Sequence, residues 1–137
     1  MKLEKKPDKP IDVQKIIRQT IDLILKEDTQ NNVKAILLFG SHADGTAMWR
    51  SDIDICAVFK REITLTEATK FRIHILGRVD DVVDLQVFHT LPVKVRNAIV
   101  ENHKILFNSP DFDEFSFMKR TKTSFFEWKN KKVMLEA

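Results

Sequence analysis

The sequence predicts an α/β domain of the α+β type, in which a mixed sheet of about four strands is flanked by helices. Its 137 residues suffice for one domain. Stretches with helical periodicity and short apolar runs follow one another in the order helix, strand, strand, helix, strand, helix, strand, helix. The loop expected over residues 40–50 joins the first two strands too closely for a full crossover, so the sheet should be mixed rather than wholly parallel.

The first half of the chain contains one helix and two strands. A helix is expected over residues 12–26, because apolar side chains recur there at helical spacing and Asp12 can cap the first turn. The apolar run 33–39 is bounded by polar turn residues, which is typical of a buried strand. Residues 40–50 should form a loop with room for one helical turn, and 53–59 should form the second strand.

The second half continues the alternation and ends in a helical segment. Its helix, strand, helix, strand and C-terminal helix or helix pair are expected over residues 65–76, 82–88, 92–101, 104–107 and 111–132. Thr64 or Thr66 can cap the first of these helices, and Gly77 should end it. Pro92 suits the first turn of the next helix, because proline lacks the N–H that a first turn leaves unpaired.

Composition excludes several classes of protein. Hydrophobic residues make up 43% and charged residues 31%, an ordinary globular balance. No apolar run approaches the ~20 residues of a membrane span, and the N-terminus lacks the apolar core of a secretory signal. The one cysteine, Cys56, excludes an internal disulfide, should be buried and inert, and fits a cytoplasmic protein. Residues 1–10 are expected to be a flexible tail before a single domain over 11–132.

Aspartates within apolar strands are the strongest chemical signal. Asp52 and Asp54 open a strand whose remainder is apolar, and a period of two places both carboxylates on one face. Asp84 lies in a third strand that a crossover can bring alongside. Carboxylates this close repel each other, and a hard cation such as Mg²⁺ removes the conflict. Together they indicate a two-metal platform for phosphoryl or nucleotidyl transfer.

A glycine–serine pair lies where the first strand ends. Gly40 allows the backbone to approach a phosphate closely, and Ser41 can add a hydroxyl to the backbone N–H groups that bind it. No Walker-type GKS or GKT occurs in the chain. Structural interpretations also remain open. Ser41 could be a turn residue, Asp52 and Asp54 could be surface residues at a strand start, and Asp84 could face solvent on an edge strand. His42, in the same loop, is expected to be solvated.

These motifs together resemble the DNA polymerase β-like nucleotidyltransferase superfamily, in particular its minimal nucleotidyltransferase (MNT) domains. The run FGS at 39–41 is followed by ten residues and by DID at 52–54, and residues 83–112 resemble the second half of MNT antitoxins. The resemblance implies the polymerase β-like fold over roughly residues 33–128. It also implies transfer of AMP from ATP to a tyrosine of a HEPN-domain ribonuclease toxin, which the MNT protein neutralises.

The resemblance also assigns roles. Gly40 and Ser41, with Ser51 before the aspartate pair, would bind the nucleotide. Asp52, Asp54 and Asp84 would be both the catalytic residues and the ligands of two Mg²⁺ ions, for which Mn²⁺ could substitute. Asp84 would help deprotonate the attacking hydroxyl. This chain departs from the family at Asp44, where relatives usually carry an arginine, and thereby lacks a positive charge near the triphosphate.

Two other functions stay open beside that of a protein-modifying enzyme. The chain could be an antitoxin that acts by binding alone, or a nucleotidyltransferase for nucleic acid or a small molecule. Nucleic acid and small molecules are both less favoured as acceptors, because nucleotidyltransferases that act on them usually add a helical domain for which this chain has no room.

The C-terminal segment is rich in aromatic and basic residues, which favours the core and a protein interface, with homo-oligomerisation as one possibility. A helical phase set from Phe112 places Phe115 and Phe126 with it over the sheet. Phe117 and Trp128 should then lie in the interface.

Overall fold

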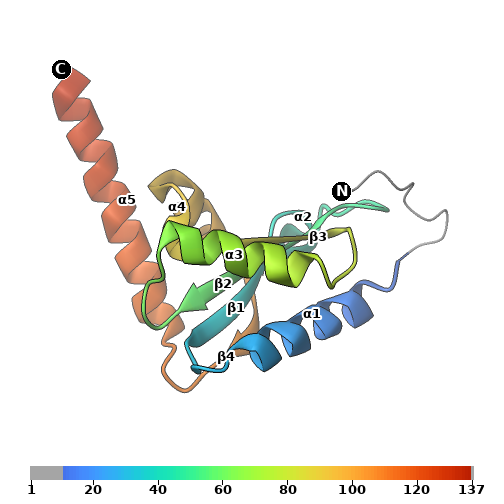
Figure 1. The fold of residues 1–137 in the computed structure, drawn as a ribbon. Coiled ribbons are helices and arrows are strands. Elements are labelled where there is room, and N and C mark those ends of the chain that lie inside the picture. Colours follow the sequence, from blue (N-terminus) through green and yellow to red (C-terminus); the bar gives the residue numbers. More distant parts are fainter. Residues whose placement is uncertain (1–10, 137) are drawn as a thin grey trace.

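The computed structural model describes residues 11–136, so the tail expected over 1–10 lies outside the described residues. The strands are β1 (Val33–Phe39), β2 (Ile53–Phe59), β3 (Val83–Val87) and β4 (Lys104–Asn108). The helices within this range are α1 (Val13–Glu27), α2 (Ser41–Asp44), α3 (Leu65–Leu76), α4 (Val93–Glu101) and α5 (Glu114–Glu136), with a 3-10 turn η1 (Phe88–Thr90) (Figure 1).

The strands form one mixed sheet in the order β3-β2-β1-β4. β1 pairs antiparallel with both β2 and β4, while β2 and β3 are parallel. The short β1–β2 connection allows only the antiparallel arrangement, and α3 supplies the crossover between the parallel pair. The predicted fold class, a mixed sheet of about four strands flanked by helices, is therefore confirmed.

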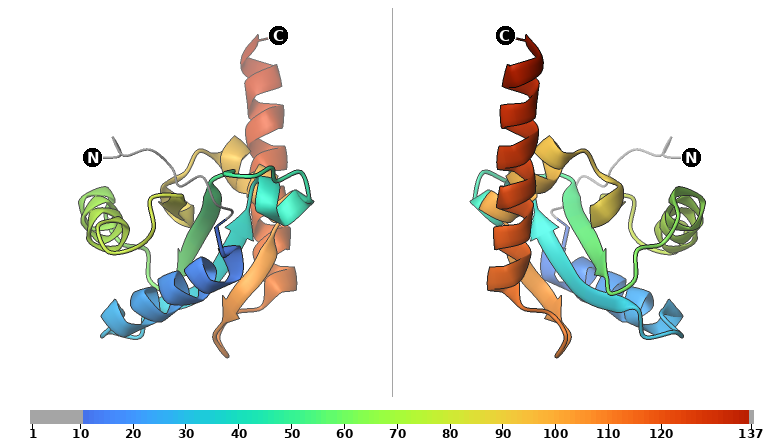
Figure 2. Two further views of the ribbon diagram at one scale, coloured as in Figure 1. Left: turned by 90° about the vertical axis from the view of Figure 1, so that its right-hand side faces the viewer. Right: turned by 90° about the vertical axis from the view of Figure 1, so that its left-hand side faces the viewer.

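The two faces of the sheet are covered by different helices (Figure 2). One face packs against α1 and α3 and includes Ile36, Leu38, Ile53, Ile55 and Leu85, all at most 5% exposed. The other face packs against α4 and α5, through a second cluster of side chains that the strands contribute at alternate positions: Ala35, Leu37, Cys56 and Val58. Cys56 is fully buried, as expected, and burial raises the pKa of its thiol.

Helix starts follow the expected capping chemistry with one adjustment. The Asp12 carboxylate accepts from the Lys15 backbone N–H (3.1 Å). Thr64, not Thr66, caps α3 in a capping box in which Thr64 and Glu67 satisfy each other's backbone N–H groups. Pro92 is the N-cap of α4, one position before the first turn that was predicted for it.

α5 is a single helix of 23 residues that continues past residue 132, and the views show its C-terminal half extending away from the sheet (Figures 1 and 2). The predicted aromatic stripe is wrong. Phe117 packs against Phe88 and Phe112, with ring centroids 4.6 and 5.2 Å away, whereas Phe115 and Phe126 are 74% and 64% exposed. Phe112 precedes the helix, so a phase set from it does not apply to α5.

Among the helices of residues 11–136, none has the length and hydropathy needed to cross a membrane.

Candidate active site

Two of the predicted site aspartates meet across neighbouring strands. In the parallel register of β2 with β3, Asp54 lies directly opposite Asp84. Ile53 and Ile55 belong to the cluster under α1 and α3, so Asp54 points to the face that α4 and α5 cover in part. Both aspartates are half-buried. The sheet thus holds two carboxylates side by side at the start of the parallel strand pair.

The surroundings of Asp54 disfavour its charged form. Burial raises the pKa of this carboxyl above its ordinary value, and the charges of Asp84 and Asp52 raise it further. His42 acts in the opposite direction through its charge. The main cause is desolvation, and the second is repulsion between like charges, which a bound cation would relieve. Carboxylate oxygens are also the ligands that Mg²⁺ prefers, so the donor set fits the predicted metal.

Asp84 has a neighbour that the sequence analysis did not single out. The Gln86 side-chain amide donates to Oδ2 of Asp84 (3.1 Å). Residues 84 and 86 share a face because side chains alternate along a strand. A polar residue two positions after a strand aspartate was the available signal, and it was overlooked. The amide restrains the orientation of the Asp84 carboxylate.

Asp52 lies just before β2 and is exposed. Within the described residues, no group of three or more His, Cys, Asp or Glu side chains lies in an arrangement that could hold a metal ion. The structure therefore brings Asp54 and Asp84 together by strand register and leaves Asp52 at the adjoining end of the loop. The assignment of all three as metal ligands stays a prediction.

Gly40 is the point where the loop touches the aspartates. Its φ of 71° lies in the left-handed region that favours glycine, and a Cβ at this position would collide with Oδ2 of Asp54. The glycine is needed for two reasons, backbone conformation and close approach. Ser41, the next residue, begins α2, so the glycine brings the start of this helix close to Asp54.

The loop after α2 uses Asp44 as a structural residue. Its carboxylate accepts from the backbone N–H and the hydroxyl of Thr46, and these hydrogen bonds lower the pKa of Asp44. Gly45, with a φ of 83°, ends the short helix. Asp44 thus stabilises the turn and adds negative charge to it.

Ser51 and His42 close the far end of the loop. The Ser51 hydroxyl accepts from the Met48 N–H (2.8 Å), and the Ser51 N–H donates to the Met48 carbonyl (2.9 Å). His42 Nε2 lies 3.2 Å from the Ser51 carbonyl oxygen. The expectation that His42 is simply solvated is wrong, because its ring is half-buried and faces this turn. Ser51 shapes the approach to Asp52, and its nucleotide-binding role stays a prediction.

The fold and the aspartate pair define a nucleotidyltransferase. Residues 19–112 match the family model described as "Polymerase beta, Nucleotidyltransferase", and the chain belongs to this family. A curated relative is the MJ1547 protein of Methanocaldococcus jannaschii, assigned as a protein adenylyltransferase, with 34% identity over 115 residues. The match covers 77% of this chain and 88% of the relative.

Solved structures show the same fold at lower identity. A chain of a toxin–antitoxin structure with AMP-PNP matches with a TM-score of 0.68 and 20% identity, over 85% of this chain and 93% of that one. A chain of the toxin–antitoxin MntA-HepT matches at 0.67 and 18%, over 89% and 94%. A Shewanella oneidensis structure, a tri-AMPylated HEPN toxin in complex with an MNT antitoxin, matches at 0.66 and 18%, also over 89% and 94%. These matches confirm the predicted polymerase β-like fold.

Proposed function

We propose that this protein is a Mg²⁺-dependent protein adenylyltransferase, which transfers AMP from ATP to a hydroxyl group of a partner protein. The observation that carries the proposal is the register of β2 with β3, which sets Asp54 opposite Asp84 beside the turn at Gly40. The protein acceptor is supported by the 34% identity to the M. jannaschii protein, whose assigned activity is protein adenylyltransfer.

The partner we propose is a HEPN-domain toxin, which adenylylation would neutralise, so that this chain acts as its antitoxin. The similarity in fold to chains of MntA-HepT and of an AMPylated HEPN toxin complex supports this choice. We place the reaction in the cytoplasm, where a lone, buried thiol such as that of Cys56 needs no disulfide partner.

In the proposed reaction, the acceptor oxygen forms a bond to the α-phosphorus of ATP. The bond from that phosphorus to the oxygen bridging the α- and β-phosphates breaks, and pyrophosphate leaves. Asp84 takes the hydroxyl proton, and the Gln86 amide holds its carboxylate in place. Gly40 and Ser41 bind the triphosphate through backbone N–H groups and the serine hydroxyl.

Asp52, Asp54 and Asp84 are the residues that would hold Mg²⁺. The ion, when bound, supplies charge neutralisation for the triphosphate and the leaving pyrophosphate. The raised pKa of Asp54 supports this role, because a carboxylate pair without a cation is strained by repulsion and desolvation.

The acceptor residue must lie on another chain if it is a tyrosine, because this protein contains none. The test is incubation with ATP labelled in the α-phosphate, with and without the HEPN-domain protein. We expect label on the partner only, and only with Mg²⁺ or Mn²⁺. Label on this chain alone, or transfer that persists in EDTA, would contradict the proposal.

A pair of isosteric variants makes this test specific. Asp54→Asn should lower the rate by about a hundredfold or more, because it removes a charge on which the metal and the triphosphate depend. Asp22→Asn, on the exposed surface of α1, is the matched control and should leave the rate unchanged. Equal rates for the two variants would remove Asp54 from the mechanism.

One observation favours a second function, that of an antitoxin that acts by binding alone. Asp44 replaces a positive charge with a negative one near the proposed triphosphate site and is engaged with Thr46. If this substitution abolishes nucleotide use, the chain should inhibit the toxin equally well as wild type and as Asp54→Asn. Ribonuclease assays with both forms, with and without ATP, separate the two functions.

A further inference from the structure

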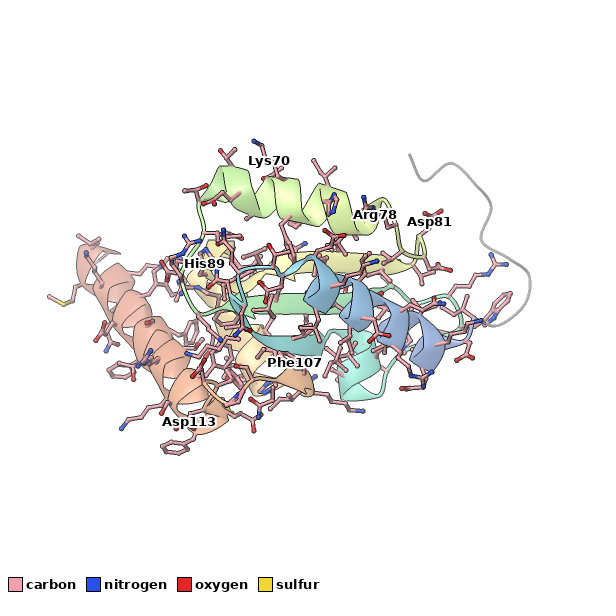
Figure 3. All side chains as sticks on the ribbon, turned by 60° about the horizontal axis from the view of Figure 1, so that its bottom comes forward. Lys70, Arg78, Asp81, His89, Phe107 and Asp113 are labelled. Carbon is pink, nitrogen blue, oxygen red and sulfur yellow. The ribbon has the colours of Figure 1, made fainter. Side chains whose placement is uncertain are left out.

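A cavity of about 380 Å³ lies at the opposite end of the sheet from the aspartates. Its wall is formed by the start of β1, the end of β2, η1, α4 and the first half of α5. These elements contribute, in the same order, Lys34, Phe59, Phe88, Arg96 and Arg120. In Figure 3, His89 and Asp113, which also line it, lie at the end of the sheet next to α5, while Asp81 lies at the other end.

The cavity lies well away from the proposed transfer site. β2 runs from Ile53, beside Asp54, to Phe59, which lines the cavity. At about 3.3 Å per residue, the five steps from Asp54 to Phe59 separate the two places by roughly 16 Å along the strand. A ligand in the cavity would therefore not contact Asp54 or Asp84.

The acids of the cavity wall are largely engaged in structural interactions. Asp111 forms an ion pair with Lys60 (2.9 Å), and the hydrogen bond from Lys60, together with the charges of Lys60 and Lys34, lowers the pKa of this carboxyl. Asp113 caps α5, because its carboxylate accepts from the backbone N–H groups of Phe115 and Ser116. Glu62, which is exposed, is the third acid of the lining.

The cations of the lining outnumber its acids. Four side chains carry a positive charge, Lys34, Lys60, Arg96 and Arg120, against three acids, Glu62, Asp111 and Asp113, so the lining has a net charge of one positive, which favours an anion. Arg96 and Arg120 form no ion pair with any described residue. Two guanidinium groups also offer the forked N–H geometry that suits phosphate oxygens.

The Arg96 side chain is partly buried where it lines the cavity. Its Nε is enclosed by protein and has no hydrogen-bond partner within the described part of the chain, so the outer N–H groups of the guanidinium are the ones that could donate to an anion. A partly buried charge without a counter-ion favours an anionic ligand beside it.

The rest of the wall suits a small molecule. Phe59, Phe88 and Phe117 contribute aromatic surface, and Ser116 and Ser124 contribute hydroxyl groups. The volume falls within the range of small-ligand sites, which combine apolar walls with a few polar groups.

We propose that this cavity binds a small phosphate-bearing molecule, held by Arg96 and Arg120, at a site separate from the aspartates. The phosphate group is the shared chemistry, and its source is either free phosphate or a nucleotide such as AMP. This inference does not depend on the proposed adenylyltransfer.

The test is isothermal titration calorimetry of the full chain with inorganic phosphate, AMP and acetate, in EDTA and at low salt. EDTA suppresses metal-dependent binding at the aspartates. We expect phosphate or AMP to bind at one site, and tighter binding of AMP would identify the nucleotide as the source. Acetate should bind at least tenfold more weakly, because it carries one charge.

Substitutions locate the site. Arg96→Gln and Arg120→Gln should each weaken binding about tenfold or more, whereas Arg18→Gln, on the exposed surface of α1, should change it less than twofold. Asp54→Asn should leave it unchanged. Arg120 is exposed, so its variant should fold even if Arg96→Gln does not. The proposal fails if neither phosphate nor AMP binds, if acetate binds equally well, or if a folded Arg120→Gln binds like the wild type.

Discussion

The two faces of the sheet use the same strands for different purposes. On the face under α1 and α3, Ile53, Ile55 and Leu85 are completely buried. Asp54 and Asp84, which are next to these residues in the sequence, point to the other face, where they are half-buried and carry like charges. Alternation along β2 and β3 thus places a stabilising contact and a destabilising one at successive positions.

This difference shows how a small sheet can tolerate a repulsive site. Burial of an isoleucine side chain contributes roughly 1.5–3 kcal/mol, so the apolar face offsets the repulsion that the aspartates introduce. The unfavourable interactions are confined to carboxylates whose repulsion a bound cation would relieve. Stability and chemistry should therefore be separable by substitution at adjacent residues, and the predictions below test that separation.

The largest expected effect on stability is at Ile55. Ile55→Ala removes a fully buried side chain and should lower the free energy of unfolding by about 2–5 kcal/mol. Asp54→Asn, one residue earlier, should not lower the free energy of unfolding, although it should lower the rate of transfer by about a hundredfold or more. Urea unfolding of both variants measures the contrast. If Asp54→Asn is as destabilising as Ile55→Ala, both faces contribute to stability and the proposed separation of stability from chemistry is wrong.

The next effect tests the corrected phase of α5. Phe117→Ala should lower the free energy of unfolding by about 2–4 kcal/mol, because this ring packs against Phe88 and Phe112. Phe126→Ala, on the exposed side, is the matched control and should change it by less than about 0.5 kcal/mol. Thermal unfolding compares the two variants. A larger loss for Phe126→Ala than for Phe117→Ala would mean that Phe126, not Phe117, packs against the sheet.

Association is a separate readout for α5. Large apolar side chains remain exposed along its length, including Phe126, Trp128 and Val133, so the predicted oligomerisation stays a prediction. Sedimentation of the same two Phe variants shows whether the exposed side is used for self-association.

Local patterns predicted most of the fold, because strands and helices differ in period. The antiparallel β1–β2 pair followed from a short connection, and the aspartates stood out because acids are rare in apolar strands. Spacing also gave the glycine–serine turn. These features depend on residues close together in the chain, which is the information a single sequence contains.

The remainder depended on contacts between distant residues. Nothing local specifies that Asp54 pairs with Asp84, since register arises from packing of whole strands. The position of His42 beside Ser51 required the loop to fold back on itself. The predicted faces of α5 were wrong because the helical phase was set from Phe112, which lies two residues before the helix begins. Periodicity does not locate the start of a helix to within two residues.

A smaller effect is expected where the loop meets the aspartates. Gly40→Ala combines a left-handed backbone with a collision against Asp54, and should lower the free energy of unfolding by about 1–3 kcal/mol and reduce transfer. Gly45→Ala is the control, because φ is also positive there but nothing lies within 4 Å of the added Cβ. Chemical denaturation should show Gly40→Ala as the more destabilised. Equal losses would mean that strain alone matters and that the contact with Asp54 is unimportant.

The smallest expected effect is the pH dependence of stability that Asp54 contributes. Its pKa is raised in the folded protein by burial and by Asp84 and Asp52, so the folded state holds this proton more tightly than the unfolded chain does. Stability from this group is therefore greatest at low pH and is lost as pH rises from the unfolded value, near 4, through the raised folded value.

Asp54→Asn cannot ionise, so in EDTA the variant should be more stable than the wild type at pH 7. That advantage should shrink as pH falls from the raised folded value towards about 4, and it should be absent below about 4, where the wild-type carboxyl is protonated in both states. Melting temperatures of the two proteins across this range provide the measurement, with Asp22→Asn as the exposed control. An advantage that stays constant with pH would show that the substitution acts through packing, and an advantage that grows at low pH would show that the carboxylate is stabilised, not strained, in the fold.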